Sequence, residues 1–377
     1  MSSRSHMIIS IIIIAIVFGS VGAMILIANP YEPSRIAVVV MEPGFGDMSK
    51  ADTALEGMEQ LAGDVSVQYY IPPQLPTSVP EARSIMESLA TTGLYDLILA
   101  IGADLAPAVQ TVATSFPNQK FGMIGADVAL DNVASAIYAV EESAFLGGVV
   151  AAFMAHEMPY YGDEPFDGEI GILAAVEGDT ELLPLINGFI QGVEAANSTY
   201  NLNVTLTEIN YINSWNNTIN AELQTYTMFA IHGISVIFAP VRASMPGVRE
   251  GMLRAADSFP PSQLVAGRMP LVIAAEGNQD YFGTNNPDIP VAPSWITTSV
   301  LSGTAEAIYD IINKTLWNVF PANEVLEYDL TNGGVNITDF PYSSTYLPAE
   351  LYEALDYYRE WIRTNPGVIT IDSPVPP

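Results

Sequence analysis

The chain contains no cysteine. This absence excludes disulfide bonds and thiolate metal sites, and it excludes lipid attachment through a mature N-terminal cysteine. Basic residues are scarce as well, because 12 Lys and Arg stand against 42 Asp and Glu and give a net charge of −30. Without a basic patch to replace the counterions of phosphate, the sequence argues against nucleic acid as a partner. It also disfavours binding to anionic membrane surfaces.

Sequence motifs of catalysis are also missing. The chain has no G-x-S-x-G, no P-loop and no H-E-x-x-H motif. His156 and His232 stand where helices are expected to end, and neither has a second histidine at metal-binding spacing. Pairs of acidic residues are frequent simply because the whole chain is acidic. We therefore expect no enzyme activity, no metal and no cofactor.

A long apolar segment stands near the start of the chain. Residues 7–28 carry no charge and are long enough to cross a bilayer as a helix, which takes roughly 20 residues. Arg4 and His6 precede them, so the positive-inside tendency places the start in the cytoplasm and the rest outside. We predict a single N-terminal anchor at residues 1–28 and a location at the cell membrane, on its extracellular face. A cleaved signal peptide is the alternative, because small residues suited to cleavage occur in this segment.

Apolar runs of strand length alternate with helical patterns after a short spacer at residues 29–34. The run 35–41 is continuous and β-branched, which is typical of a strand buried on both faces. The alternation of strands and helices predicts a parallel sheet covered by helices, and the pattern restarts after residue 138. The expected strands are 35–41, 65–71, 95–101, 120–124, 134–138, 168–174, 204–211, 236–239, 271–275 and 296–300.

The predicted fold class is α/β, with two doubly wound Rossmann-like lobes joined by a hinge and preceded by an N-terminal transmembrane helix. Ligands of such sheets bind outside the carboxyl ends of the strands, so we expect a ligand cleft between the lobes. Three crossovers are expected, near residues 139, 297 and 322. The divisions are 1–28 for the anchor or signal segment, 29–34 for the spacer, 36–139 plus 298–322 for lobe 1, 140–297 plus 323–346 for lobe 2, and 347–377 for a C-terminal helix and tail.

Several local stretches point to a known family. Residues 131–135 are Asp-Asn-Val-Ala-Ser, and residues 141–147 are Glu-Glu-Ser-Ala-Phe-Leu-Gly. Residues 187–193 are Asn-Gly-Phe-Ile-Gln-Gly-Val, and residues 211–216 are Tyr-Ile-Asn-Ser-Trp-Asn. These stretches resemble motifs of the basic membrane protein family of substrate-binding proteins, the purine-nucleoside receptors that serve ABC transporters.

The resemblance runs from about residue 35 to 371 and includes Thr298-Ser-Val300, together with a closing helix and short final strand at 347–371. It implies the fold of type I periplasmic binding proteins. It also implies a small-molecule, nucleoside-like ligand and an ABC permease as partner. The matched stretches belong mostly to the structural scaffold, so they support the predicted fold more strongly than the predicted ligand.

The positions that this family uses for its ligand are kept in part. The aromatic residue that stacks on the base is replaced by Lys50, and a second stacking Phe is replaced by Leu185. Asn278 stands where the family has an Asp that binds ribose. The residues that fit the family pattern in the turn after the first strand are Glu42, Gly44, Asp47 and Ser49.

The candidate ligand residues follow the ends of expected strands. Glycines in the turn at 42–47 let the backbone approach a ligand, and Phe45 is placed to substitute for the missing stacking ring. Carboxylate and amide groups at 276–279 suit ribose-like hydroxyls. Arg242 either pairs with a carboxylate across the cleft, or holds an anionic ligand, or forms a structural ion pair. The candidates are Glu42, Phe45, Asp47, Ser49, Lys50, Arg242, Glu276, Asn278 and Gln279.

We therefore predict an extracytoplasmic substrate-binding protein that captures a nucleoside or similar small solute between its lobes for an ABC importer. The alternative is a membrane-anchored sensor or surface-structural glycoprotein that keeps the fold without transport. Five N-x-[ST] sequons are candidate glycosylation sites in an exported chain. Their asparagines are Asn197, Asn203, Asn216, Asn313 and Asn336.

Overall fold

The computed structural model describes residues 33–46, 48–157, 168–258 and 270–371. The expected anchor at 1–28 lies outside these residues. No helix in the described part of the chain is long and apolar enough to cross a membrane. The contacts between residues group the chain into two compact units, and each is described by itself. Unit 1 is Met1–Gly44 (in its described part), Ala54–Ile137 and Thr304–Leu326, and unit 2 is Phe45–Thr53, Tyr138–Gly303 and Glu327–Pro377.

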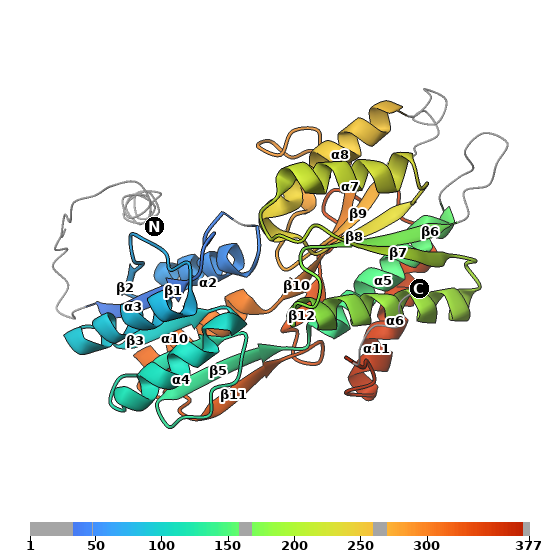
Figure 1. Cartoon of the computed structure of the whole chain (residues 1–377). Coiled ribbons are helices and arrows are strands. Elements are labelled where there is room, and N and C mark those ends of the chain that lie inside the picture. Colours follow the sequence, from blue (N-terminus) through green and yellow to red (C-terminus); the bar gives the residue numbers. More distant parts are fainter. Residues whose placement is uncertain (1–32, 47, 158–167, 259–269, 372–377) are drawn as a thin grey trace, which may run out of the picture. The chain divides into compact units, whose positions relative to one another are not determined.

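Unit 1 is built on a six-stranded sheet in the order β11-β5-β4-β3-β1-β2, shown in blue, cyan and orange-red in Figure 1. The strands from β1 to β5 pair in parallel. Strand β3 is buried at every position because its Leu-Ile-Leu-Ala-Ile run is apolar on both faces. The strands are β1 (Ser34–Val40), β2 (Val67–Tyr70), β3 (Leu97–Ile101), β4 (Phe121–Ile124), β5 (Val133–Tyr138) and β11 (Glu324–Tyr328).

Helices cover both faces of this sheet. α3 (Val79–Thr92) and α4 (Ala106–Ser115) pack on one face, where they share a core with alternate residues of β1, β3 and β4. α3 begins with a proline in its first turn and ends at Gly93, whose left-handed backbone (φ 62°) suits glycine at that position. α10 (Thr304–Leu316) packs against β4 and contacts α2 (Lys50–Asp64).

Unit 2 contains a second six-stranded sheet in the order β12-β10-β9-β8-β6-β7. All pairings are parallel except that of β12 with β10, which is antiparallel. The strands are β6 (Glu169–Ala174), β7 (Thr205–Tyr211), β8 (Val236–Ala239), β9 (Leu271–Ala275), β10 (Ile296–Ser302) and β12 (Val335–Ile337).

Alternate residues of each central strand of unit 2 enter two different cores. Ile172 and Ala174 of β6 pack with α5 (Val140–Glu157), α6 (Leu182–Tyr200) and α11 (Ala349–Thr364). Leu173, which points to the opposite face, packs with α7 (Thr218–Ala230) and α8 (Met245–Ser258). Figure 1 shows these two helix layers on opposite faces of the sheet. Unit 2 is therefore doubly wound, as the sequence predicts.

Helices α5 and α6 approach each other through glycine. A Cβ atom at Gly188 or Gly192 of α6 would meet the carbonyl oxygen of Glu141 or Phe145 of α5 at well under 3.0 Å, a separation that Cβ atoms essentially never show. A Cβ at Gly148 of α5 would meet the backbone of α6 in the same way. The glycines in the stretch 187–193 thus serve helix packing, which agrees with a scaffold role for that stretch.

The end of the chain differs from the sequence expectations in three places. Strand β10 lies wholly in the sheet of unit 2, and the chain passes to unit 1 only after Gly303, so a boundary at 298 would divide a buried strand. Strands β11 and β12 were not expected, because β11 is mostly exposed and carries two Glu, and β12 has only three residues. The expected short final strand is absent from the described residues after α11, which end at 371.

Candidate functional site

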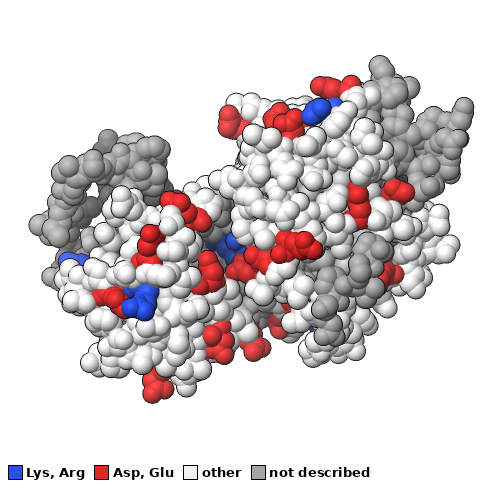
Figure 2. Space-filling view, in the orientation of Figure 1, with Lys and Arg blue, Asp and Glu red and all other residues white. Residues whose placement is uncertain are grey.

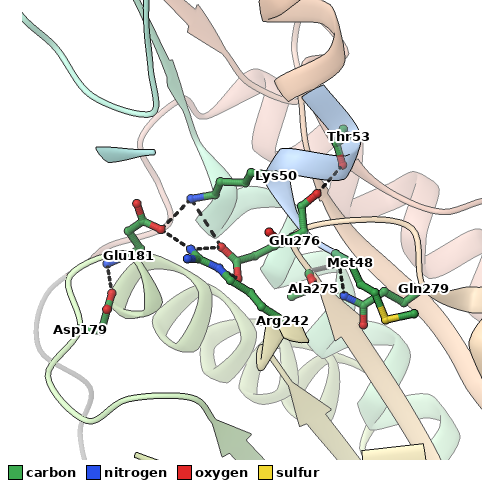
Figure 3. A network of polar contacts seen from close by, with 10 residues as sticks. Met48, Lys50, Thr53, Asp179, Glu181, Arg242, Ala275, Glu276 and Gln279 are labelled. Atoms are coloured by element: carbon green, nitrogen blue, oxygen red, sulfur yellow. Dashed lines mark hydrogen bonds and ion pairs between the residues drawn. The ribbon is translucent and has the colours of Figure 1, made fainter. Parts of the chain in front are cut away.

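Charged side chains gather at the carboxyl ends of three neighbouring strands of unit 2. Glu181 precedes α6 after β6, Arg242 follows β8, and Glu276 follows β9. Because β6, β8 and β9 are adjacent and parallel, their carboxyl ends meet at one edge of the sheet. Lys50, in the segment Phe45–Thr53 of the same unit, completes the group. We call Lys50, Glu181, Arg242 and Glu276 the charged cluster, and Figure 3 shows the two cations converging on the two carboxylates.

Arg242 is held from two directions. Its Nε donates to Glu276 Oε2 at 2.8 Å and its Nη2 donates to Glu276 Oε1 at 2.7 Å, which is a two-point contact between planar groups. Nη2 also donates to Glu181 Oε2. The same oxygen of Glu181 accepts from Lys50 Nζ at 3.1 Å, and Lys50 Nζ lies 3.5 Å from Glu276 Oε1. The cluster therefore balances two positive charges with two negative ones.

Burial and neighbouring charge act in opposite directions on these groups. Burial favours the neutral form of Glu181, but Lys50 and Arg242 outweigh it and hold the pKa of Glu181 well below its usual range. Burial likewise disfavours the charged guanidinium, but Glu276 and Glu181 outweigh it and raise the pKa of Arg242. Glu181 and Arg242 are therefore ionised at neutral pH.

The backbone of the cluster adopts conformations that residues with side chains rarely use. Arg242 has φ 45° and Glu276 has φ 74°, both in the left-handed region. Such strain costs free energy and is concentrated at functional sites, where the surrounding structure maintains it. The ring of Trp215 supports the arrangement, because the guanidinium carbon of Arg242 lies 3.8 Å from its centroid.

The structure brings three of the predicted ligand residues together, namely Lys50, Arg242 and Glu276. Of the alternatives that the sequence left open for Arg242, an ion pair forms, and both of its carboxylate partners belong to unit 2. Gln279 is fully buried, and its Nε2 donates to the carbonyl oxygens of Met48 at 2.7 Å and Ala275 at 3.1 Å. Figure 3 shows Gln279 pointing toward Met48 and away from the charged cluster.

The other candidates occupy different surroundings. Ser49 is buried, and its carbonyl oxygen accepts from the backbone and side chain of Thr53. Asn278 is exposed, and its Oδ1 accepts from the backbone N–H of Asp280. Glu42 is exposed at the end of β1 in unit 1, and Phe45 is half-buried in unit 2. Asp47 lies outside the described residues. Roles for these residues in ligand binding stay predictions.

Glu181 is the member of the cluster that the sequence reasoning missed. It lies in the loop that follows β6. The rule that ligands bind beyond the carboxyl ends of the strands, which selected Arg242 and Glu276, applies to this loop as well. The signal was therefore present, but acidic residues are so frequent in this chain that a single Glu does not stand out. Figure 2 shows how acidic side chains spread over one face with few basic ones among them.

A second polar group of unit 2, centred on Asp280, is buried. Asp280 Oδ1 accepts from Ser299 Oγ at 2.6 Å, and Oδ2 accepts from Thr338 Oγ1 at 2.6 Å. Its backbone oxygen accepts from Ser294 Oγ at 2.5 Å. These bonds tie the loop after β9 to β10 and to the chain after β12. Burial raises the pKa of Asp280 to about 6, although the two hydroxyl donors lower it in part.

This buried carboxyl should make stability depend on pH. The pKa of Asp280 rises from its ordinary 3.8 to about 6 in the folded state, so folding binds a proton between these values. Its stabilising contribution is present below about pH 4 and is lost as the pH rises through about 6, at a cost of about 2 to 3 kcal/mol. Asp280→Asn removes the titration, so the unfolding free energy of the variant relative to the parent should rise by that amount from pH 4 to pH 8 in denaturant titrations. A relative stability that stays constant over this range would contradict the prediction.

The five sequon asparagines differ in exposure. Asn203 and Asn216 are exposed. Asn197 uses its amide to donate to the carbonyl oxygen of Val204 and to accept from its N–H. Asn313 accepts from the indole of Trp317, and Asn336 accepts from Arg359. A glycan attaches to Nδ2, which in Asn197 donates to Val204, whereas the bonds of Asn313 and Asn336 are accepted by Oδ1 and leave Nδ2 available. Exposure therefore favours Asn203 and Asn216 among the five candidates.

Comparison with known proteins shows which family this chain resembles. Residues 35–360 match the family described as ABC transporter substrate-binding protein PnrA-like. The ABC transporter nucleoside-binding protein BmpA of Lactococcus lactis is 24% identical over 244 residues, which are 64% of this chain and 63% of that protein. Basic membrane protein B of Borreliella burgdorferi is 25% identical over 269 residues, 69% of this chain and 68% of the relative. An uncharacterized lipoprotein of Pyrococcus abyssi is 28% identical over 153 residues, only 40% and 37% of the two lengths.

Solved structures show the same fold at lower sequence identity. A solute-binding protein of an ABC transporter system from Aeropyrum pernix has a TM-score of 0.73 and 20% identity, with 88% of this chain and 92% of that chain covered. A periplasmic solute-binding protein from Actinobacillus succinogenes, solved with bound D-allose, has a TM-score of 0.55 and 14% identity, with coverage of 84% and 100%. The two-lobed α/β fold of periplasmic binding proteins predicted from the sequence is thereby confirmed.

Proposed function

Because the chain belongs to the family of PnrA-like ABC transporter substrate-binding proteins, we propose that it captures a nucleoside or a similar small solute for an ABC importer. The family and the fold are those of solute-binding proteins. The name of the Lactococcus lactis relative, which binds nucleosides, supports this class of ligand. The comparisons do not favour the alternative of a sensor or structural protein.

The observation that carries the proposal is the charged cluster at the carboxyl edge of the second sheet. Glu276 can accept from hydroxyl and amino groups, and the N–H groups of Lys50 and Arg242 that do not face Glu181 can donate to carbonyl oxygens and ring nitrogens. A nucleoside presents all of these groups on its base and sugar. The strained backbone at Arg242 and Glu276 fixes the polar groups before ligand arrives, which reduces the ordering cost of binding.

We further propose that the protein works outside the cytoplasm, is held at the membrane and delivers its solute to a permease. The relatives named lipoprotein and basic membrane protein support a membrane location. Because this chain has no cysteine, lipid on a cysteine is excluded, and the apolar segment at 7–28 is the proposed anchor.

Phe45 is the proposed stacking partner of the base of a bound nucleoside, and the nucleoside affinity of a Phe45 variant tests this role. Stacking of a base on an aromatic ring contributes about 1 to 3 kcal/mol, so Phe45→Ala should weaken nucleoside binding about 5- to 150-fold. Titration calorimetry with purine and pyrimidine nucleosides gives the affinities. Phe320→Ala is the matched control, because Phe320 is also half-buried but lies in unit 1, near Lys120.

Two results would decide against these assignments. Unchanged affinity in Phe45→Ala would remove Phe45 from the site while leaving the solute class intact. No heat with any nucleoside, in folded protein freed of co-purified ligand, would refute nucleoside binding itself.

A further inference from the structure

We propose that Lys50 and Arg242 form a subsite for an anionic oxygen group, a carboxylate or a phosphate, and that Glu181 occupies this subsite until the solute replaces it. This inference rests on the proposed function and narrows it. The solute would be nucleoside-like and would carry such a group. A neutral nucleoside would not displace Glu181 from this subsite.

The two glutamates of the charged cluster hold the cations in different ways. Glu276 is only 2% exposed in its side chain and grips Arg242 with both oxygens, so it positions the guanidinium. Glu181 is 18% exposed and places one oxygen, Oε2, between Lys50 Nζ and Arg242 Nη2. That oxygen stands where an oxygen of a bound carboxylate or phosphate would bridge the same two donors.

Both cations can be reached by a solute. The side chains of Lys50 and Arg242 are 15% and 19% exposed. The loop that carries Glu181 contains Gly178 (φ 75°), where a Cβ atom would meet nothing within 4 Å. Glu177, Gly178 and Thr180 are exposed, so a change of conformation there need not break a core contact. Glu181 can therefore leave the cations at lower cost than Glu276.

Charge balance decides which class of solute can replace Glu181. With Glu181 in place, two cations face two carboxylates. A neutral solute in its place would leave a partly buried positive charge without a counter-charge, which is costly. An anionic group restores the balance, and the guanidinium fork and the ammonium both suit planar carboxylate and phosphate oxygens. The chain has only 12 Lys and Arg against 42 acidic residues, so a pair of cations in one cluster is unusual here.

The test uses matched ligands that differ only in this group. Adenosine, adenosine 5′-carboxylate and adenosine 5′-monophosphate, with the corresponding uridine series, are titrated into the full protein by calorimetry. We expect the anionic members to bind more tightly than their parent nucleoside. Comparing the affinities of the carboxylate and the phosphate identifies which anionic group the subsite prefers. Lys50→Gln should lower the affinity for the anionic members by about 10- to 150-fold, so that it approaches the affinity for the parent nucleoside. Lys50→Arg should keep the preference.

Glu181→Gln is the most discriminating variant, because the proposed subsite predicts the direction in which its affinity for the anionic members changes. Gln is a weaker competitor for the cations, so affinity for the anionic members should rise by about 5- to 20-fold. Glu222→Gln is the control, since it removes the same charge from the exposed pair of Glu222 with Arg254 and should change nothing. Thermal unfolding of each variant establishes that it is folded.

The outcomes separate this inference from the function on which it rests. Binding of parent nucleosides without binding of the anionic members overturns the subsite and leaves nucleoside capture intact. Weaker binding of the anionic members by Glu181→Gln also overturns it, because Glu181 would then contact the solute. No binding of any member of either series overturns both.

Discussion

Gly192→Ala is expected to lower the unfolding free energy by about 3 kcal/mol or more. The new methyl group would collide with the carbonyl oxygen of Phe145, which is backbone of α5 and cannot rotate away as a side chain would. Helices α5 and α6 would have to move apart, and the core that both helices share with α11 and the sheet would lose contacts. Guanidinium chloride unfolding, followed by circular dichroism, measures the loss.

Gly63→Ala is the matched control for this substitution. Gly63 lies near the end of α2, is exposed, and has no atom within 4 Å of a Cβ. Alanine there should stabilise the protein by up to about 1 kcal/mol, because helix propensity improves and nothing is displaced. The opposite signs of the two variants exclude a general effect of replacing glycine in a helix. Equal stability of Gly192→Ala and the parent would show that α5 and α6 adjust freely.

Arg242→Met should destabilise the protein by about 3 to 5 kcal/mol. The loss follows from the carboxylates left behind, because Glu276 is nearly fully buried and would lose its main charge partner. Arg254→Met is the control: Arg254 also faces a ring, Tyr226 at 4.1 Å, and pairs with Glu222, but its side chain is 53% exposed. Loss of such a surface pair should cost at most about 1 kcal/mol.

The double variant Arg242→Met with Glu276→Met tests the reason for that loss. It removes the orphaned carboxylate together with the guanidinium and leaves Lys50 paired with Glu181. We expect most of the stability to return, to within about 1 to 2 kcal/mol of the parent. If the double variant is as unstable as the sum of the two single variants, the cost comes from lost packing against Trp215 and not from buried charge.

Most of the scaffold follows from local sequence pattern. The strands expected at 236–239 and 271–275 are β8 and β9 with the same bounds, and α3 begins with a proline in its first turn and ends at Gly93. These elements have strong local causes, namely buried apolar runs, a proline in the first helical turn and a glycine after the last. Strand β11 has no such cause, because it is exposed and gains its conformation only from pairing with a strand far away in the sequence.

The charged cluster could be predicted only in part. Glu276 directly follows buried strand β9, and Arg242 stands shortly after buried strand β8, so the rule that ligands bind at carboxyl ends selects both without a structure. Their ion pair and their positive φ values depend on how β8 and β9 lie side by side, which no local pattern reports. Lys50 and Glu181 are 131 positions apart, and their contact exists only once the fold has formed.

The chain order of unit 1 has a consequence for its synthesis. Strand β11 pairs beside β5, yet it begins roughly 190 residues after β5 ends. At about 5 to 20 residues per second, a ribosome needs on the order of 10 to 40 s to supply it. During that interval β5 is an open edge of a parallel sheet, and α10 is missing from one face. Unit 1 therefore cannot close its sheet during translation until most of unit 2 has emerged, and the newly made chain needs protection from edge-to-edge aggregation for that time.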